Sequence, residues 1–433
     1  MQTQACSPTV YRPRRPARTV LHKVVRENLQ TYLEASDTDV DFSGQVPFHV
    51  QKAFRAYIKC GVLAHGFARA FCAGCGHGFL IAFSCKGRDL CPSCSTRRMV
   101  ETAAHMIDTV LPRVPYRQWV LSVPKRIRWH MREKPEVTSG LLQVFLRAVE
   151  TTVRQRSPDA PSGARFGAIA FTHRFGSFLN RHVHYHVLVT DGVFSKDANG
   201  EAIFHPALEL DANDFLSVQT KMRARGLRWM HRHEHLDSAA VASLDSMDHA
   251  GGWSVDASVR IEEWNRQGLE RLVRYCARPP ISGERLAWLN DTTLVYSLRK
   301  PTLDGQMELV LTPLELLDRL SKLITPPRIH KHRYCGVLAP NAKLRPSVIA
   351  SADPPLQLCS CCRKRKRRWD CWMLAHQQAK STLMPMKSRR ANSIWPLLAV
   401  GRFYWPASTN VFRSHAPNAF PRCELLPSLK SQR

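Results

Sequence analysis

The residues best suited to chemistry in this sequence are cysteines and histidines that recur at short, regular spacings. Cys72 with Cys75 and Cys91 with Cys94 form two pairs, each with two intervening residues, and fifteen residues separate the pairs. Two such pairs can deliver four thiolates to one tetrahedral zinc ion. Because four thiolates complete the coordination sphere, the spacing predicts a structural Zn²⁺ whose binding energy helps to fold a small module.

Two further cysteines, Cys85 and Cys60, lie within or close to the same segment. They are candidates for a second zinc site, and the alternative is that they are ordinary structural residues. Basic residues also surround the cluster, which is typical of a zinc module that binds nucleic acid. The ones expected to contact DNA are Lys86, Arg88, Arg97 and Arg98.

Three histidines alternate with other residues in the segment RHVHYHVLVTDG. On a β-strand, alternate side chains share one face, so His182, His184 and His186 are expected to point the same way. Imidazoles that share a face can converge on one divalent cation. The alternative is a polar, solvent-facing surface on an edge strand.

One tyrosine has an equally informative setting. In IEEWNRQGLERLVRYCARPP the apolar residues recur at helical spacing, and Tyr275 falls at the border between this apolar stripe and a basic face. The basic face carries Arg271, Arg274 and Arg278. A phenol at this border could present its hydroxyl to a phosphate held by the arginines. The alternative is a tyrosine that packs at the edge of the core.

The elements that must position these residues are mixed in type. Strand patterns cover residues 117–124, 164–176 and 181–194, and helical patterns cover 19–35, 97–112 and 139–156. This alternation predicts an α+β fold. The segment 238–258 reads as a loop or linker. The predicted divisions are a basic helical lead-in (1–47), a zinc-binding, DNA-binding module (48–112), a sheet domain (113–345) and a basic tail (346–433).

The charge of the chain predicts its partner. With 63 Lys and Arg against 35 Asp and Glu, the formal net charge is +28. Such an excess favours a polyanion, and nucleic acid is the leading one, since phosphate neutralisation releases counterions; anionic lipid is the alternative. No apolar run of about 18 residues or signal-peptide pattern occurs, so we expect no membrane partner. The expected location is cytoplasmic, in association with the nucleoid of a bacterial-type cell.

The end of the chain differs from the rest. Six consecutive basic residues occupy 363–368, and residues 391–433 contain one acidic residue, Glu424. This segment lacks periodicity, so no fold is predicted for it. It reads as an altered or out-of-frame end, which leaves open whether this copy is active.

Six segments in a fixed order point to a family. They are CGVLAHGF, SCKGRDLCPSC, RQWVLSVP, HVHYHVLVTDGVF, RYCARPPI and YCGVLAPNAKLR, within residues 12–346. Together they resemble the HUH single-strand DNA transposases of the insertion sequence 91 family. The resemblance implies an HUH-type antiparallel sheet flanked by helices and preceded by a small zinc-binding module.

The resemblance also implies roles for individual residues. His184 and His186 take the place of the ligands of a catalytic Mg²⁺ or Mn²⁺, with His182 as an accessory candidate, and Tyr275 takes the place of the nucleophile. Two-tyrosine members carry a second tyrosine four residues away, where this chain has arginine at 271 and proline at 279. The chain therefore resembles the single-tyrosine branch found in common-region elements.

The implied reaction is cleavage of single-stranded DNA at the element ends through a 5′-phosphotyrosine intermediate, followed by rolling-circle transposition. No GxxxxGK[ST] phosphate loop occurs, which agrees with a reaction that needs no ATP. The alternatives are a replication initiator or relaxase with the same chemistry, and a zinc-dependent DNA-binding regulator without catalysis. A carboxylate-triad transposase is disfavoured because no acidic triad stands out. The target sequences and the oligomeric state are left open.

Overall fold

The computed structural model describes residues 14–38, 44–72, 78–248, 252–301, 304–350, 352 and 423–425. Two compact units are formed. The larger unit contains residues 18–58 and 85–355, and the smaller contains residues 1–17, 59–84 and 356–433. The predicted tail, 346–433, therefore lies largely outside the described residues.

The smaller unit contributes an antiparallel hairpin. Strand β1 (Phe67–Cys72) pairs with β2 (Gly78–Ala82), and β14 (Cys423–Leu425) pairs with the other edge of β1. Cys72 lies in β1, but its side chain and Cys75 are outside the described residues, so the predicted pair stays a prediction.

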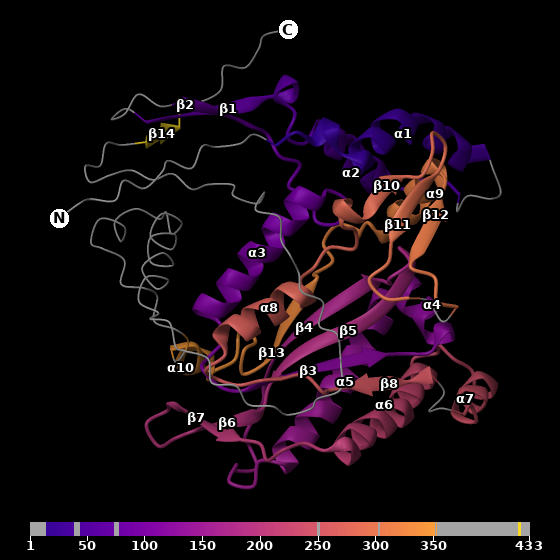
Figure 1. Ribbon diagram of the computed structural model, residues 1–433. Coiled ribbons are helices and arrows are strands. Elements are labelled where there is room, and N and C mark those ends of the chain that lie inside the picture. Colours follow the sequence, from indigo (N-terminus) through magenta and orange to yellow (C-terminus); the bar gives the residue numbers. More distant parts are fainter. Residues whose placement is uncertain are drawn as a thin grey trace, which may run out of the picture. The chain divides into compact units, whose positions relative to one another are not determined.

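The larger unit holds the central sheet and most of the helices (Figure 1). In chain order its elements up to the middle of the sheet are α1 (Val20–Thr38), α2 (Phe48–Lys59), α3 (Pro92–Thr109), β3 (Tyr116–Ser122), α4 (Lys125–Glu133), α5 (Pro135–Gln155), β4 (Gly167–Phe175), β5 (Arg181–Thr190), β6 (Gly192–Lys196) and β7 (Ala202–Pro206). The remaining elements are α6 (Ala212–Arg232), α7 (Ser238–Asp245), β8 (Ser254–Asp256), β9 (Arg260–Ile261), α8 (Arg266–Cys276), β10 (Leu286–Trp288), β11 (Leu294–Ser297), β12 (Glu308–Leu311), α9 (Pro313–Leu323), β13 (His332–Gly336) and α10 (Arg345–Ala350).

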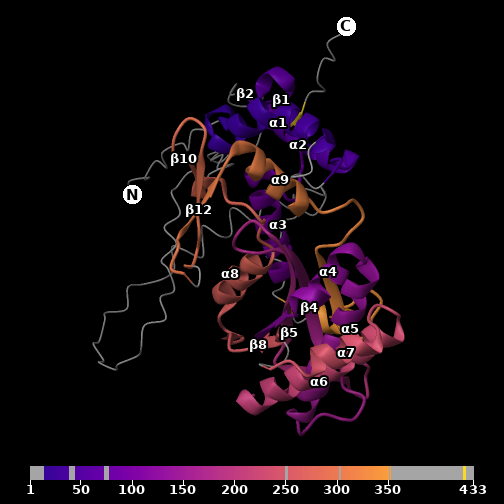
Figure 2. The same ribbon diagram turned by 90° about the vertical axis from the view of Figure 1, so that its right-hand side faces the viewer.

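The central sheet is antiparallel, with strand order β13-β4-β5-β3-β8, and β9 also pairs with β3. Helices cover both faces. The α4–α7 helices pack on one face, around Tyr185 and Val187, whereas α3 and α8 pack on the other, around Phe171 and Leu188 (Figures 1 and 2). The predicted α+β class and the antiparallel sheet flanked by helices are confirmed. Because strand side chains alternate, β5 sends its tyrosine and valines into the first layer and its histidines toward α8.

The segment predicted as a loop, 238–258, contains structure. Residues 238–245 form helix α7, with Leu244 buried, and residues 254–256 form strand β8 at the sheet edge, after the buried Trp253. The prediction of a loop was wrong because each element is too short to show a recognisable hydrophobic periodicity in the sequence. Packing of these apolar side chains against the α4–α7 layer, rather than local propensity, determines the structure.

The helix predicted over residues 19–35 is confirmed as α1, which packs against α9. The hydroxyl of buried Tyr32 donates to Oγ of Ser321 at 3.0 Å, which joins α1 to α9. Likewise α3, from the predicted zinc module, shares a core with α8, from the predicted sheet domain. The domain boundaries themselves stay a prediction.

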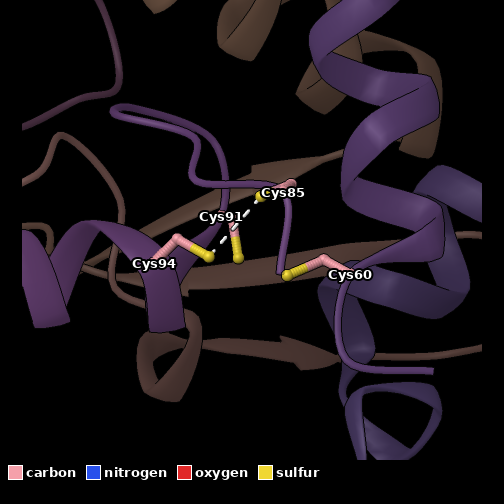
Figure 3. A group of neighbouring side chains, drawn as sticks. All are labelled: Cys60, Cys85, Cys91 and Cys94. Atoms are coloured by element: carbon pink, nitrogen blue, oxygen red, sulfur yellow. Dashed lines mark hydrogen bonds between the residues drawn. The ribbon is translucent and has the colours of Figure 1, made fainter. Parts of the chain in front are cut away.

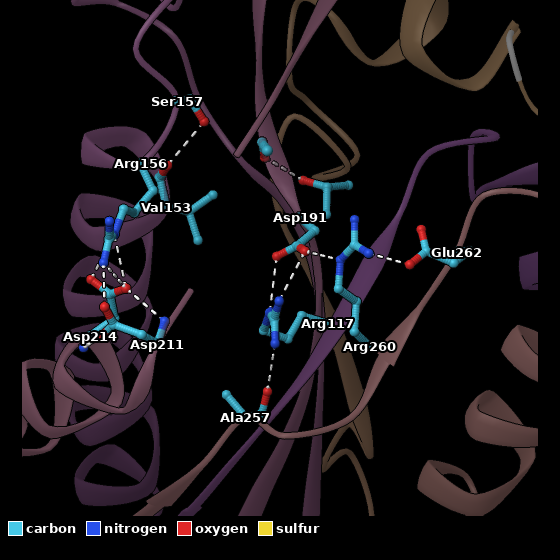
Figure 4. A network of polar contacts seen from close by, with 12 residues as sticks. Arg117, Val153, Arg156, Ser157, Asp191, Asp211, Asp214, Ala257, Arg260 and Glu262 are labelled. Atoms are coloured by element: carbon cyan, nitrogen blue, oxygen red, sulfur yellow. Dashed lines mark hydrogen bonds and ion pairs between the residues drawn. The ribbon is translucent and has the colours of Figure 1, made fainter. Parts of the chain in front are cut away.

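A buried ion network fixes the segment that leads into α8 (Figure 4). Asp191, which follows β5, accepts hydrogen bonds from Nε of Arg117 at 3.0 Å and Nε of Arg260 at 2.6 Å. Arg117 also donates to the carbonyl of Ala257 at 3.0 Å. Arg117 and Asp191 are almost fully buried, so removing either one would leave an uncompensated buried charge. The network thereby holds β9 and the backbone at Ala257 against β3.

Candidate active site and zinc centre

Three histidines from two neighbouring strands face α8. His184 and His186 come from β5 and His173 from β4, where it lies opposite His184 in the register. One ring nitrogen from each lies within 4.8 Å of the others. The ring centroids are 4.4 Å apart for His173 and His186, and 5.0 Å apart for His184 and His186. These distances would let all three imidazoles bind one cation.

The hydrogen bonds of these rings leave one nitrogen of each available. Nε2 of His173 donates to the carbonyl of Cys276 at 2.6 Å, and Nδ1 of His184 donates to the carbonyl of His182 at 3.2 Å. Within the described chain, Nδ1 of His173 and Nε2 of His186 are buried and have no hydrogen-bond partner. Histidine ligands of metals usually donate the other ring N–H to a carbonyl or a similar acceptor. The cluster therefore fits a divalent cation.

The protonation of the cluster agrees with this fit. Burial, followed by the neighbouring imidazoles, lowers the pKa of His184 to about 3. Burial and the nearby Arg278 lower the pKa of His186 to about 4, and burial holds the pKa of His173 well below its ordinary value. All three rings are therefore neutral at pH 7, and their free lone pairs can accept a cation without first losing a proton.

His182 lies beside this cluster but outside the group of three. Its ring is 4.9 Å from that of His184, and Nη1 of Arg128 lies 3.4 Å from its Nδ1. His173, by contrast, belongs to the group, although the sequence did not single it out. It falls in the predicted strand 164–176, but spacing along the chain does not reveal that this strand pairs with the histidine strand.

Gln118 is a second residue that the sequence did not single out. It lies on β3, buried, with its amide nitrogen 3.0 Å from Nδ1 of His186 and 3.3 Å from Sγ of Cys276. The amide therefore contacts both a histidine of the cluster and the residue that follows Tyr275. A strand places it there because residues 116 and 118 share the face toward α8.

Tyr275 lies in the last turn of α8 and is 41% exposed. Its ring centroid is 5.5 Å from that of His186, with the rings edge to face. The guanidinium of Arg278 lies 4.5 Å from the Tyr275 centroid and 5.5 Å from that of Phe175. The accessible phenol of Tyr275, the guanidinium of Arg278 and the imidazole cluster thus lie close together.

The other predicted DNA-contacting arginines differ in how free they are. Arg271 is exposed, whereas Arg274 pairs with Glu270 at 2.5 Å and Arg97 pairs with Glu101 at 2.7 Å. Of the four predicted residues near the cysteines, two use their guanidinium groups on backbone carbonyls. Arg88 donates to the carbonyl of Ile329 at 2.9 Å, and Arg98 donates to the carbonyl of Lys86 at 3.2 Å. Their roles in DNA binding stay predictions.

A cavity of about 260 Å³ adjoins the histidine cluster. His173, Arg174 and Arg278 line it together with Arg98 of α3 and Lys331. Asp89, the one acidic residue of this lining, forms an ion pair with Lys331. The positive excess suits a phosphate-bearing ligand next to the imidazoles.

Three cysteines of the larger unit form a second candidate metal centre, and Figure 3 shows their side chains. Cys85 precedes α3, Cys91 is the N-cap of α3 and Cys94 lies in its first turn. Their sulfur atoms all lie within 4.8 Å of one another, and Cys85 and Cys94 are 3.6 Å apart. Tetrahedral zinc with Zn–S bonds of about 2.3 Å places its sulfurs about 3.8 Å apart. The arrangement therefore fits three thiolate ligands of a structural Zn²⁺.

This cluster combines one predicted pair, Cys91 and Cys94, with one accessory cysteine, Cys85. Cys60 lies in the smaller unit, so its role as a zinc ligand stays a prediction. The spacing of the two CxxC pairs did not reveal the place of Cys85, because Cys85 belongs to neither pair.

Changing Cys94 to serine is expected to remove bound zinc and to lower the melting temperature, because the binding energy of a structural zinc contributes to folding. Cys335→Ser is the matched control, since Cys335 lies in β13 outside the cluster. Elemental analysis checks the change. One zinc per wild-type chain indicates one site, two indicate a further site such as one using Cys72 and Cys75, and none would contradict the zinc assignment.

Comparisons with known proteins match two parts of the chain. A family model described as a transposase zinc-binding domain matches residues 24–123, and one described as a putative transposase matches residues 167–345. The chain is 23% identical over 310 residues to the transposase for insertion sequence element IS801 of Pseudomonas savastanoi pv. phaseolicola; the alignment covers 65% of this chain and 68% of that protein. No solved structure matches the chain significantly.

The two family matches and the relative therefore identify the chain as a transposase, an enzyme that acts on DNA. Together they support a transposase of the insertion sequence 91 family with a zinc-binding domain in its amino-terminal part. DNA is accordingly its partner. Among the described residues, no helix combines the length and apolar character needed to cross a membrane.

Proposed function

We propose that this transposase cleaves and rejoins single-stranded DNA at element ends, with Tyr275 as the nucleophile and with Mg²⁺ or Mn²⁺ held by His184, His186 and His173. The observation that carries the proposal is the position of an accessible tyrosine ring 5.5 Å from an imidazole of a three-histidine cluster. When bound, the cation would polarise the scissile phosphate.

The proposed reaction exchanges one phosphoester bond for another. The Tyr275 oxygen attacks phosphorus, the bond from phosphorus to the 3′ oxygen breaks, and the products are a 5′-phosphotyrosine and a free 3′-hydroxyl. The phenolic proton leaves Tyr275, and the departing 3′ oxygen takes up a proton. Because the energy of the phosphoester bond is conserved, the 3′-hydroxyl of another strand can reverse the step, which supports rolling-circle transposition without ATP.

Arg278 is suited to hold the scissile phosphate. Its guanidinium lies over the rings of both Tyr275 and Phe175, and its buried Nε has no hydrogen-bond partner within the described residues. A phosphate oxygen could satisfy that donor in a charge-assisted bond. The cavity beside His173, lined by Arg174 and Arg278, could take the adjoining part of the strand.

The test uses the full chain and an oligonucleotide that carries an element end. With Mg²⁺ or Mn²⁺, a single-stranded substrate should yield a covalent protein–DNA adduct that survives denaturation, whereas the same sequence as a duplex should not. An adduct that forms equally with duplex DNA would contradict the single-strand assignment. DNA binding without any cleavage, with the cation present, would favour the zinc-dependent regulator.

Gln118 is expected to act as a positioning residue for His186. In the structure the amide nitrogen of Gln118 faces Nδ1 of His186 and Sγ of Cys276. In the flipped orientation of the amide, its oxygen would accept the Nδ1–H and keep the Nε2 lone pair free for the cation. Gln118→Met should weaken Mn²⁺ binding about 10- to 100-fold, whereas Gln118→Glu, which keeps an acceptor, should restore most of it. Titration with Mn²⁺ followed by calorimetry measures both.

The matched control is Gln219→Met, which changes the same residue type on α6, where Gln219 accepts a hydrogen bond from the backbone of Val255. Unchanged Mn²⁺ affinity in Gln118→Met would refute the positioning role. Equal weakening in Gln118→Glu and Gln118→Met would show that the amide donates rather than accepts.

A further inference from the structure

Helix α4 has an unusual surface for a helix of nine residues. It carries four basic residues and one acidic residue: Lys125, Arg126, Arg128, Arg132 and Glu133. Ile127 and Met131 are buried and anchor it to the sheet layer that contains α5 and α6. Trp129, between these anchors in sequence, is 51% exposed, and its ring meets that of His130 edge to face at 4.9 Å. The helix therefore presents a large aromatic ring within a basic surface.

The same helix contacts the histidine strand. Nη1 of Arg128 lies 3.4 Å from Nδ1 of His182, and Nε of Arg128 donates to the carbonyl of Val123 at 2.7 Å. His182 is the next histidine along β5 from His184, with ring centroids 4.9 Å apart. Its Nε2 is buried and has no partner within the described residues. Polar groups thus continue from the candidate catalytic cluster to α4.

An exposed tryptophan among cations matches the chemistry of single-stranded DNA. Proteins that bind single strands combine a basic surface for the phosphates with aromatic rings on which unpaired bases stack. In a duplex the faces of the bases are covered by their neighbours, so a single tryptophan ring on a helix can stack only on an unpaired or displaced base. The charge of α4 and its continuity with the histidines favour a nucleic-acid strand over an apolar protein partner.

We infer that α4 is a binding platform for single-stranded DNA, in which Trp129 stacks on a base and the cations of α4 hold the adjoining phosphates. The strand would leave the cleavage site past His182 and Arg128 and continue over Trp129. The inference rests on the proposed function for the direction of the strand, but the binding itself does not require cleavage. Within this platform Arg128 and His182 are positioned to contact the phosphate nearest the cleavage site.

The experiment measures binding in the Tyr275→Phe background, so that failure of the cleavage chemistry does not affect the result. Trp129→Ala should weaken binding of a single-stranded element end about 5- to 150-fold, the effect of losing one base–aromatic stack of roughly 1–3 kcal/mol. Trp129→Phe should retain most of the affinity, and affinity for duplex DNA should be unchanged. Trp264→Ala is the matched control, because Trp264 is also exposed but precedes the opposite end of α8 from Tyr275.

A second measurement locates the contact. A substrate with 5-iododeoxyuridine at successive positions should crosslink on irradiation to Trp129 from one or two positions next to the cleavage site, and Trp129→Ala should lose that crosslink. Wild-type affinity of Trp129→Ala for the single strand, with no crosslink to α4 from any position, would overturn the inference. Equal loss of affinity for single-stranded and duplex DNA would also overturn it, because the platform would then be only a basic surface.

Discussion

Tyr275→Phe is expected to abolish the covalent protein–DNA adduct and to reduce strand cleavage to the background level. The substitution removes only the phenolic oxygen that would attack phosphorus, and the ring can keep its contacts with His186 and Arg278. Binding of the single-stranded substrate should change little. Denaturing electrophoresis of labelled oligonucleotide after incubation with Mg²⁺ or Mn²⁺ measures adduct and cleaved product together.

Tyr334→Phe is the control for this change. Tyr334 lies in β13, outside the group of three histidines, and the guanidinium of Arg345 lies over its ring. Removing its hydroxyl should leave adduct formation unchanged. A full yield of adduct from Tyr275→Phe would refute the assignment of the nucleophile.

The second large effect is expected from the histidine cluster. His184→Ala and His173→Ala should each reduce cleavage by more than about 100-fold. Losing a residue that only hydrogen-bonds to a metal ligand typically lowers metal affinity or activity about 10- to 100-fold, and losing a ligand itself should have a larger effect. Salt-dependent DNA binding should remain, since it depends mainly on the basic residues. The two variants should also bind Mn²⁺ more weakly in the absence of DNA.

Two further variants make this test specific. His182→Ala should lower Mn²⁺ affinity less than His184→Ala or His173→Ala does, because His182 lies outside the group of three histidines. His205→Ala, in strand β7, should leave both cleavage and Mn²⁺ affinity unchanged, since His205 forms a hydrogen bond with Ser195 in a separate hairpin. Wild-type Mn²⁺ affinity in His173→Ala would exclude His173 as the third ligand, while His184 and His186 could still hold the cation.

The sequence alone predicted the parts of the site that lie on single elements. The alternation of histidines on β5 and the helical spacing around Tyr275 are local periodicities, and both elements formed as expected. The α+β class and the family were predicted in the same way from ordered local patterns, and both are confirmed.

The parts that the sequence did not predict depend on contacts between distant segments. His173 and Gln118 join the cluster because β4 and β3 flank β5 in the sheet. The order of strands in a sheet cannot be predicted from the periodicity of any one segment. The predicted loop at 238–258 failed for a related reason, since burial of Trp253 and Leu244 in the sheet layer gives it structure.

The most direct test of the account is to identify the residue that carries DNA in the covalent adduct. The wild-type adduct, formed on a single-stranded element end with Mn²⁺, is digested with protease and nuclease and analysed by mass spectrometry. The account predicts a 5′-linked nucleotide on the hydroxyl of Tyr275 and on no other residue. A nucleotide attached to any other side chain, or a linkage through the 3′ end, would contradict it.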